Sequence, residues 1–369
     1  MTILAFLGHP AHFHLFKHTI AGLRSNGHRV DVCIKKKDIL EELLFRSGID
    51  YTNLLPNGRA DGTFGILKGV LKKDIGLYKF CKANRPDLML GTSAEIAHIG
   101  KLLRIPSINF SEDDVSVIRK FATAAYPFSG HILSPVACNN GRWNRKTVFY
   151  KGYQKLAYLH PNRFRPDEDI ASKYIRNGEP YFLIRFAKLT AHHDSGIRGI
   201  NDAIAGELVK KLEKFGNVYI SSERTLSPDF EGYRLEIDPL DIHHLLAFAK
   251  LYIGDSQSMS VESAMLGTPS IRYSDFMGKI GVLEELEKTY GLTYGVNPDN
   301  PRDLFDTVDR FLEMSSLYES FQNRRRIMLE DKIDVTAFFQ WFIEQYPESS
   351  SIMQKDPNYQ DRFKNSFSN

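Results

Sequence analysis

The stretch LYIGDSQSMSVESAMLGTPSIR, from Leu251 to Arg272, decides the fold class. It starts with a short apolar run that predicts a buried strand, continues through a small polar segment into a helical run, and turns at Gly-Thr-Pro into a second apolar strand. Consecutive parallel strands need a crossover of this kind, and a helix is the usual one. The stretch therefore predicts an α/β fold with a parallel sheet.

The polar segment of this stretch has the chemistry of an anion-binding turn. Short side chains at the start of a helix leave backbone N–H groups open to a phosphate, and the helix dipole is positive there. In open α/β sheets, ligands bind beyond the carboxyl ends of the strands, where this segment lies. We therefore expect a phosphate to be held by Asp255, Ser256, Gln257, Ser258 and Met259.

Glu262 follows one turn into the predicted helix. Its carboxylate is placed to accept hydrogen bonds from the two hydroxyls of a ribose whose diphosphate rests on the turn. The alternative is that Glu262 only complements the helix dipole and that Ser258 is only an N-cap. A capping box does not explain Glu262, because the residue three positions earlier is Met259 and not Ser or Thr.

The same alternation of short apolar runs and helical segments extends outward in both directions. Helices are expected between the strands, for example at 13–25 and 94–103, and two long helices after Pro301. The predicted strands of the first half are 2–7, 29–34, 87–90, 106–110, 131–134 and 147–150. Those of the second half are 181–186, 218–221, 251–254, 270–273 and 292–295.

The alternation lapses between residues 156 and 180, where several prolines and charges occur. We predict an N-terminal Rossmann-like domain at 1–158, a linker at 159–179 and a C-terminal Rossmann-like domain with its helices at 180–347. The polar residues 348–369 are expected to be a flexible tail. A length of 369 residues agrees with two domains.

Composition excludes several classes of protein. The net charge is only +3, from 48 basic and 45 acidic residues, so no nucleic-acid partner is expected. Cys33, Cys81 and Cys138 lack a Cys-x-x-Cys spacing, which argues against a disulfide framework or structural zinc and favours a reducing compartment. The chain shows no signal peptide and no run of roughly 20 apolar residues, so we expect a cytoplasmic location.

Three segments resemble a family of uncharacterised prokaryotic proteins with a predicted glycosyltransferase-B fold: GHPAHFHLFK at 8–17, YKGYQKLAYLHPNRFRPD at 150–167 and DIHHLLAFAKLYIGDSQSMSVESAMLGTPSIR at 241–272. The pattern GDSxSxxxExAxLGTPxI also resembles the donor-nucleotide motif of glycosyltransferase-B proteins and of the related non-hydrolysing UDP-N-acetylglucosamine 2-epimerases. The resemblance implies two Rossmann-like domains facing across a cleft, with a UDP-linked sugar as substrate and no cofactor. The epimerases usually have Gly-Gly where Gln257 and Ser258 stand here.

The resemblance also assigns roles to individual residues. Residues 256–258 would contact the diphosphate, Glu262 would contact the ribose, and residues 237–242 would contact the nucleobase. Asp238 and His243 are the contacts expected from this last segment and its neighbour, and Gly8 is counted with the nucleotide-sugar contacts.

The segment GHPAHFH at 8–14 is expected to be a loop after the first strand, rich in histidine. His12 or His14 is our first choice of general base, because a neutral imidazole suits that role at neutral pH. Two other interpretations are a metal site, for which no carboxylates stand nearby in sequence, and histidines bonded to the backbone. Glu112 or Asp113 is the second choice of base, unless these acids only begin a helix.

Basic residues cluster after the first strand of the second domain. Arg185 and Lys188, with His192 and His193 close by, would neutralise a leaving diphosphate, unless they are a solvated loop. The segment 222–224 would line the cleft or merely turn the chain.

The helix expected at 64–80 carries Lys68, Lys72, Lys73 and Lys79 among apolar residues. It is either a buried helix with a solvated lysine face or a helix in peripheral contact with an anionic membrane.

Together these features predict a metal-independent glycosyltransferase that uses a nucleotide-sugar donor in cell-surface polysaccharide or glycolipid synthesis. Its acceptor would be an unknown sugar or a lipid-linked acceptor, and the protein would work in the cytoplasm or at the inner face of the membrane. The alternatives are a nucleotide-sugar 2-epimerase and a non-catalytic nucleotide-sugar-binding protein.

Overall fold

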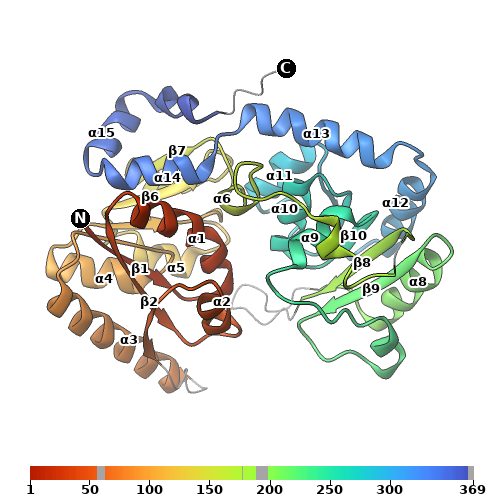
Figure 1. Ribbon diagram of the computed structural model, residues 1–369, viewed down its shortest axis with the longest axis horizontal. Coiled ribbons are helices and arrows are strands. Elements are labelled where there is room, and N and C mark those ends of the chain that lie inside the picture. The colour runs from red at the N-terminus through yellow and green to blue at the C-terminus, as the bar shows by residue number, and fades with distance from the viewer. Residues whose placement is uncertain (56–62, 177, 188–197, 365–369) are drawn as a thin grey trace. The chain divides into compact units, whose positions relative to one another are not determined.

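The computed structural model describes residues 1–55, 63–176, 178–187 and 198–364, and for 63–73 only the backbone. These residues form two compact units (Figure 1). Unit 1 consists of Met1–Arg163 and Ile333–Ser368, and unit 2 of Phe164–Lys332. The α/β fold with parallel sheets predicted from the sequence is confirmed in both units.

Unit 1 is built on a seven-stranded parallel sheet with the order β3-β2-β1-β4-β5-β6-β7. The order reverses between β1 and β4, so the carboxyl ends of these two strands form the topological switch point where ligands bind in such sheets. The strands are β1 Thr2–Leu7, β2 Arg29–Lys35, β3 Thr52–Leu55, β4 Leu88–Gly91, β5 Ser107–Phe110, β6 His131–Pro135 and β7 Thr147–Tyr150. The helices before residue 164 are α1 Pro10–Ser25, α2 Leu40–Arg46, α3 Thr63–Asn84, α4 Ala94–Leu103, α5 Arg119–Ala125 and α6 Leu156–Leu159, with a 3-10 turn, η1, at Gly141–Lys146.

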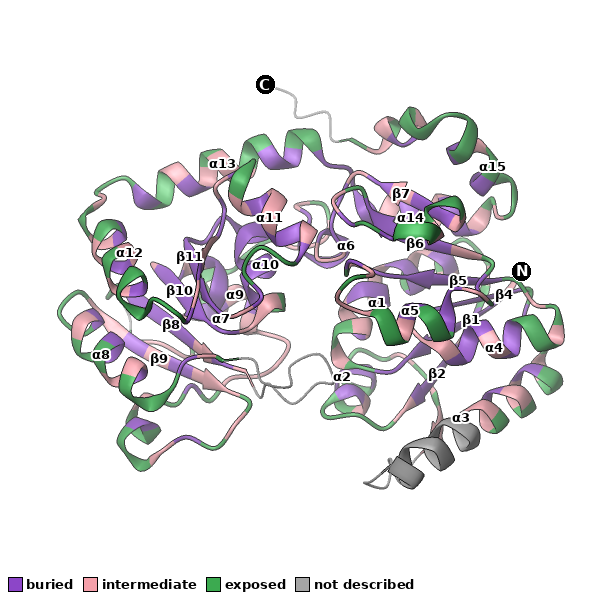
Figure 2. Ribbon diagram, turned by 180° about the vertical axis from the view of Figure 1, so that it is seen from behind, coloured by how far each residue is buried: buried purple, intermediate pink, exposed green. Residues whose placement is uncertain are grey.

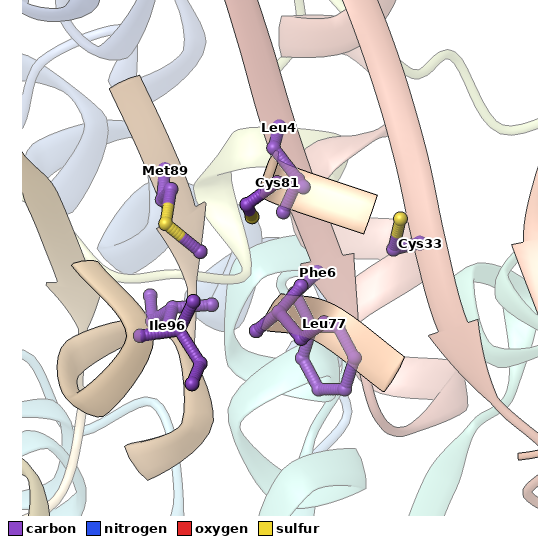
Figure 3. Close-up of a cluster of buried hydrophobic side chains, with 8 residues drawn as sticks. Leu4, Phe6, Cys33, Leu77, Cys81, Met89 and Ile96 are labelled. Carbon is purple, nitrogen blue, oxygen red and sulfur yellow. The ribbon is translucent and has the colours of Figure 1, made fainter. Parts of the chain in front are cut away.

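The core of unit 1 beneath α3 and α4 contains two of the three cysteines (Figure 3). Cys33 and Cys81 are free thiols packed among apolar side chains from β1, β4 and both helices. Burial raises the pKa of both thiols, that of Cys81 to about 12. They are therefore inert core residues at neutral pH.

Unit 2 is built on a five-stranded parallel sheet with the order β12-β11-β10-β8-β9, which reverses between β8 and β10. The strands are β8 Tyr181–Phe186, β9 Asn217–Ser222, β10 Leu251–Gly254, β11 Ser270–Tyr273 and β12 Tyr294–Val296. The helices are α7 Glu168–Ala171, α8 Asp202–Leu212, α9 Ile242–Phe248, α10 Gln257–Leu266, α11 Gly281–Lys288, α12 Pro301–Glu313 and α13 Leu317–Asp331, with a 3-10 turn, η2, at Pro228–Tyr233.

Helix α10 is the central helix of unit 2 and is buried from Met259 to Leu266 (Figure 2). It ends at Gly267, whose φ of 70° is the left-handed C-cap conformation that favours glycine. From α13, Arg325 donates to the carbonyl of Met265, and Gln322 donates to those of Leu266 and Gly267. The carboxyl end of α10 is therefore held by α13, and its other end faces the candidate site.

The C-terminal segment corrects two predictions. Helix α14, Val335–Glu344, belongs to unit 1 and not to the C-terminal domain predicted at 180–347. Its Phe338, Phe339 and Phe342 are completely buried. Residues 348–364 are not a flexible tail, because they form α15 Glu348–Lys355 and a 3-10 segment, η3, at Pro357–Phe363, and the Gln360 side chain accepts a hydrogen bond from Lys151 N.

Helix α3 confirms the helix expected at 64–80. Its Lys68, Lys72 and Lys73 lie outside the described side chains, and Lys79 is exposed. Within the described part of the chain, no helix has the length and apolar character needed to cross a bilayer.

Candidate functional site

The amino end of α10 forms an open turn at the switch point of unit 2. Ser256 is the N-cap, and its hydroxyl accepts from Met259 N at 3.4 Å, so the N-cap lies two residues before Ser258. Ser258 is exposed, and Ser256 and Gln257 are half-buried. The first N–H groups of a helix have no intrahelical partner. The turn therefore places the first backbone donors of α10 beside the exposed Ser258 and the half-buried Ser256, and the binding of a phosphate there stays a prediction.

Two residues of the predicted phosphate turn face elsewhere. Asp255 is only 1% exposed, and its carboxylate accepts from Ala187 N at 2.6 Å and from Ile200 N at 3.1 Å. The side chain of Met259 is buried in the core. Neither side chain therefore lines the turn, because one braces neighbouring loops and the other packs under the helix, and contact of a phosphate with the backbone of these two residues stays a prediction.

Gln257 reaches from α10 to the loop after β11. Its Nε2 donates to Ser274 Oγ at 3.0 Å, while its Oε1 is buried without a hydrogen-bond partner in the described structure. The side-chain amide of Gln257 therefore connects the α10 turn to the loop after β11 on one side.

Glu262 lies in the second turn of α10, because the helix begins earlier than the sequence indicated. The residue is 9% exposed, and its Oε1 lies 3.4 Å from His243 Nε2 on α9. Two residues that are 19 positions apart in the chain thus meet beside the turn. The structure therefore brings together Glu262, the predicted ribose contact, and His243, which was expected to contact the nucleobase.

Residues 237–242, the segment expected to contact the nucleobase, lead into α9. Asp238 Oδ1 accepts from Leu240 N at 3.0 Å and Asp241 Oδ2 accepts from Tyr174 Oη at 2.7 Å, which fixes the turn before His243. The carboxylate of Asp238 is engaged with this backbone, so its contact with a base stays a prediction.

Arg185 is the next-to-last residue of β8, in register with Gly254 at the end of β10. Its Nη1 donates to Ser221 Oγ at 2.5 Å and its Nη2 pairs with Glu223, while its Nε is buried without a partner among the described residues. The guanidinium therefore lies at the carboxyl edge of the sheet, held on the β9 side of β8, with its Nε unused. Lys188, His192 and His193 lie outside the described residues.

Gly8 and His12 lie at the switch point of unit 1. Helix α1 begins at Pro10 with His9 as N-cap, so His12 and His14 are helical and the predicted histidine loop is limited to residues 8 and 9. Gly8 N donates to His12 Nδ1 at 3.0 Å, and Thr92 Oγ1 lies 2.6 Å from Nε2 and 3.1 Å from Nδ1. We assign the proton of the neutral ring to Nε2, because Nδ1 accepts from a backbone amide.

This arrangement argues against His12 as a general base. Its acceptor nitrogen is occupied by Gly8 N–H, and burial lowers its pKa to about 3, assisted by His9, Lys35 and Lys155. A base must offer a free lone pair and a pKa near the working pH. His12 instead fixes Gly8 and Thr92 at the carboxyl ends of β1 and β4.

His14 also has a packing role, because its ring lies 5.2 Å from that of Tyr158 and 5.0 Å from that of Phe13. It does not join His12 in a cluster with metal-ligand geometry. No group of three or more His, Cys, Asp or Glu in the described residues is arranged to hold a metal ion.

Glu112 is held in a buried ion pair. Its Oε1 accepts from Gln154 N and its Oε2 pairs with Lys155 Nζ, both at 2.5 Å. Lys155 also lowers the pKa of His12, so two of the predicted catalytic residues, His12 and Glu112, lie near the same lysine. Sequence reasoning missed Lys155, Lys35 and Thr92, although Lys155 stands inside the quoted motif at 150–167.

Unit 2 also contains a cavity of about 400 Å³ on the carboxyl side of its sheet. Its lining includes Arg198, Ile200, Arg224 and Tyr273. Arg224 stacks on Phe186 at 4.5 Å and donates to the carbonyl of Ile200, so this cation is already engaged.

Two parallel α/β units, each with polar groups at its switch point, define a protein with the glycosyltransferase-B type of fold. The chain belongs to the family described as "Protein of unknown function (DUF354)", whose model matches residues 3–284. A search of curated protein sequences finds no match.

Solved structures share this fold. The UDP-GlcNAc 2-epimerase from Neisseria meningitidis bound to UDP-GlcNAc is 15% identical, with a TM-score of 0.60 over 90% of this chain and 99% of that one. The spinosyn rhamnosyltransferase SpnG complexed with spinosyn aglycone is 11% identical, with a TM-score of 0.63 over 93% and 100%. The S. aureus MnaA–UDP co-structure is 12% identical, with a TM-score of 0.63 over 87% and 90%. At such identities the likeness establishes the fold alone.

Proposed function

We propose that this protein is a glycosyltransferase that binds a nucleotide-sugar donor, UDP-linked, in unit 2. The diphosphate would lie on the N-terminus of α10 and the ribose on Glu262. One observation carries the proposal: an open helix N-terminus with Ser256 and Ser258 stands next to a largely buried carboxylate, at the switch point of a parallel sheet.

The same groups suit the departure of a nucleoside diphosphate. Transfer of the sugar places developing negative charge on the leaving diphosphate, and helix N–H groups and cations stabilise such charge without a metal. Arg185, whose backbone is in register with Gly254 just before the turn, has a buried Nε–H without a partner among the described residues. We expect this N–H and the first amides of α10 to hold the leaving group.

Unit 1 would supply the acceptor site and the base. Of the four candidate bases, Glu112 is the one we retain, since each of its oxygens accepts one bond and keeps a second lone pair. Lys155 would hold the carboxylate in place while it receives the acceptor's proton. An acceptor of cell-surface polysaccharide or glycolipid synthesis, a cytoplasmic site of action and a peripheral membrane contact remain parts of this proposal.

Calorimetric titration tests the donor site. We expect UDP to bind the wild-type protein, and Glu262→Ala to weaken UDP binding about tenfold or more, because hydrogen bonds to a charged acceptor contribute about 1.5–3 kcal/mol each. Inorganic pyrophosphate lacks the ribose and should compete equally well in both proteins. The control is Glu330→Ala, which removes an exposed glutamate on α13. Equal UDP affinity in wild type and Glu262→Ala would refute the proposed ribose contact.

An epimerase is the second candidate, because an epimerase bound to UDP-GlcNAc shares the fold. Incubation with UDP-GlcNAc alone, followed by NMR, separates the two functions. A transferase should leave the sugar configuration unchanged and show at most slow hydrolysis, whereas accumulation of the 2-epimer would overturn the transferase proposal. Binding without turnover, with or without acceptors, would indicate a non-catalytic binding protein.

A further inference from the structure

Three aspartates of unit 2 converge on the connection between β8 and α8. Each follows a different strand: Asp255 follows β10, Asp275 follows β11 and Asp299 follows β12. Arg198 donates to Asp275 through its backbone N at 2.7 Å and through its guanidinium at 2.8 Å, and it pairs with Asp299 at 2.6 Å. The described ends of this connection, at Ala187 and from Arg198 to Ile200, are therefore fastened to the carboxyl edge of the sheet.

Asp255 is the buried member of this set. Its two oxygens accept from Ala187 N, just after β8, and from Ile200 N, just before α8. The side chain of Asp299, by contrast, is 70% exposed, so solvent screens its pair with Arg198. One buried carboxylate thus fixes the distance between the two ends of the connection.

The same residue directly precedes the phosphate turn. Its own N–H donates to the carbonyl of Arg185 at 3.4 Å, and the next residue, Ser256, is the N-cap of α10. Asp255 therefore sets the positions of two parts of the candidate donor site, the end of β8 and the start of α10.

This bracing requires the ionised carboxylate. A carboxylate accepts at both oxygens, whereas a carboxylic acid or an amide has a donor at one of them, and that donor would face a backbone N–H. Burial raises the pKa of Asp255 to about 6, opposed by the two amide bonds and by Arg224. Among the described residues, the charged and titratable groups that face it are Arg224, which binds the Ile200 carbonyl, and Tyr252, which is completely buried in β10.

We propose that Asp255 is a positioning residue for donor binding: in its ionised form it braces Ala187 and Ile200 against the α10 turn, and its neutralisation weakens binding of a nucleoside diphosphate sugar. The part of this inference that concerns the ligand rests on the proposed function. The brace itself does not.

Hydrogen–deuterium exchange of the free protein tests the brace. At pH 7.5, Asp255→Asn should make at least one of the amides of Ala187 and Ile200 exchange about tenfold faster than in wild type, since the Asn side chain can accept at one oxygen only and one of the two hydrogen bonds is lost. The control is Asp202→Asn, at an exposed position in the first turn of α8, which should leave both amides unchanged. Equal exchange in wild type and Asp255→Asn would overturn the proposal whether or not any nucleotide binds.

The pH dependence of binding tests the link to the ligand. UDP-GlcNAc is the probe, because its diphosphate carries no group that titrates between pH 5 and pH 7.5. Wild-type affinity should fall about tenfold from pH 7.5 to pH 5, as expected if only the ionised form binds. Asp255→Asn should bind more weakly at pH 7.5 and change less than about twofold with pH, whereas Asp202→Asn should follow wild type.

The outcomes separate the two proposals. A wild-type protein that binds no nucleotide-sugar at any pH overturns the proposed function, and with it the link between Asp255 and a ligand, while the exchange experiment still decides on the brace. If Glu262→Ala weakens binding but Asp255→Asn binds like wild type, the proposed function stands and this inference fails.

Discussion

Mild acid should destabilise unit 1 through His12. Burial lowers the pKa of this imidazole to about 3 from its ordinary value of 6.5, and its Nδ1 accepts from Gly8 N. A lowered pKa means that the neutral ring stabilises the fold above pH 6.5, and that this contribution is lost as the pH falls from 6.5 towards 3. Linkage gives a loss of about 2 kcal/mol by pH 5 and about 4 kcal/mol by pH 3.

Tryptophan fluorescence isolates unit 1 for this measurement, because Trp143 and Trp341, the two tryptophans of the chain, both lie in it. Urea unfolding at pH 7.5 and at pH 5 gives the free energy of unfolding of the unit they report on. His12→Gln should lower the difference between the two pH values by about 2 kcal/mol. His18, whose pKa burial lowers to about 4, should contribute a similar part of the remaining difference at pH 5.

The control is His244→Gln, which replaces a histidine of unit 2 and should leave the fluorescence-detected pH dependence unchanged. The comparison uses the difference between pH values within each protein, so a general loss of stability in a variant cancels. A His12→Gln protein with the full wild-type difference would refute the assignment of a buried, neutral His12.

Three further substitutions or deletions test the packing. Gly254→Ala should cost about 1–3 kcal/mol in the thermal unfolding of unit 2, followed by circular dichroism, because the new Cβ would lie 2.8 Å from Tyr252 Cζ, whereas Gly232→Ala meets nothing within 4 Å and should be nearly neutral. Asp334→Ala removes the N-cap bond to α14 and a buried ion pair, so fluorescence-detected unfolding should show a loss of about 3 kcal/mol, and a loss below about 1 kcal/mol would contradict that role. Deletion of 348–369 should lower the urea midpoint of unit 1, and an unchanged midpoint would show that α15 does not contribute to stability.

Sequence reasoning predicted the sheets well because parallel strands buried on both faces are short, apolar and bounded by polar turns. The strands at 181–186, 251–254 and 270–273 have the predicted bounds. The predicted start of α1 was wrong, because the three histidines of residues 8–14 were taken to indicate a loop. In the structure His9 acts as the N-cap, and Pro10 suits the first helical position.

The candidate site could be predicted only where its residues are close in the chain. The α10 turn and Glu262 follow from one motif, since helix geometry fixes their spacing. The meeting of Glu262 with His243, and of His12 with Thr92, depends on how distant elements pack. No local pattern distinguishes an aspartate that faces a ligand from one that braces a loop, so the role of Asp255 required coordinates.

The unit to which α14 belongs could not be predicted from the sequence, for a related reason. Its apolar side chains predict that the helix is buried, but an amphipathic pattern does not say against which sheet. The structure assigns it to unit 1, next to α1 and α6.

This discontinuity has a consequence for synthesis on the ribosome. Every element of unit 2 has been translated once residue 332 is added, whereas unit 1 still lacks the three phenylalanines of α14 that complete its core. The second unit to be translated is thus the first whose chain is whole. Until α14 emerges, the nascent first unit exposes apolar surface that the finished protein covers, and it is at this stage that a chaperone has most to protect.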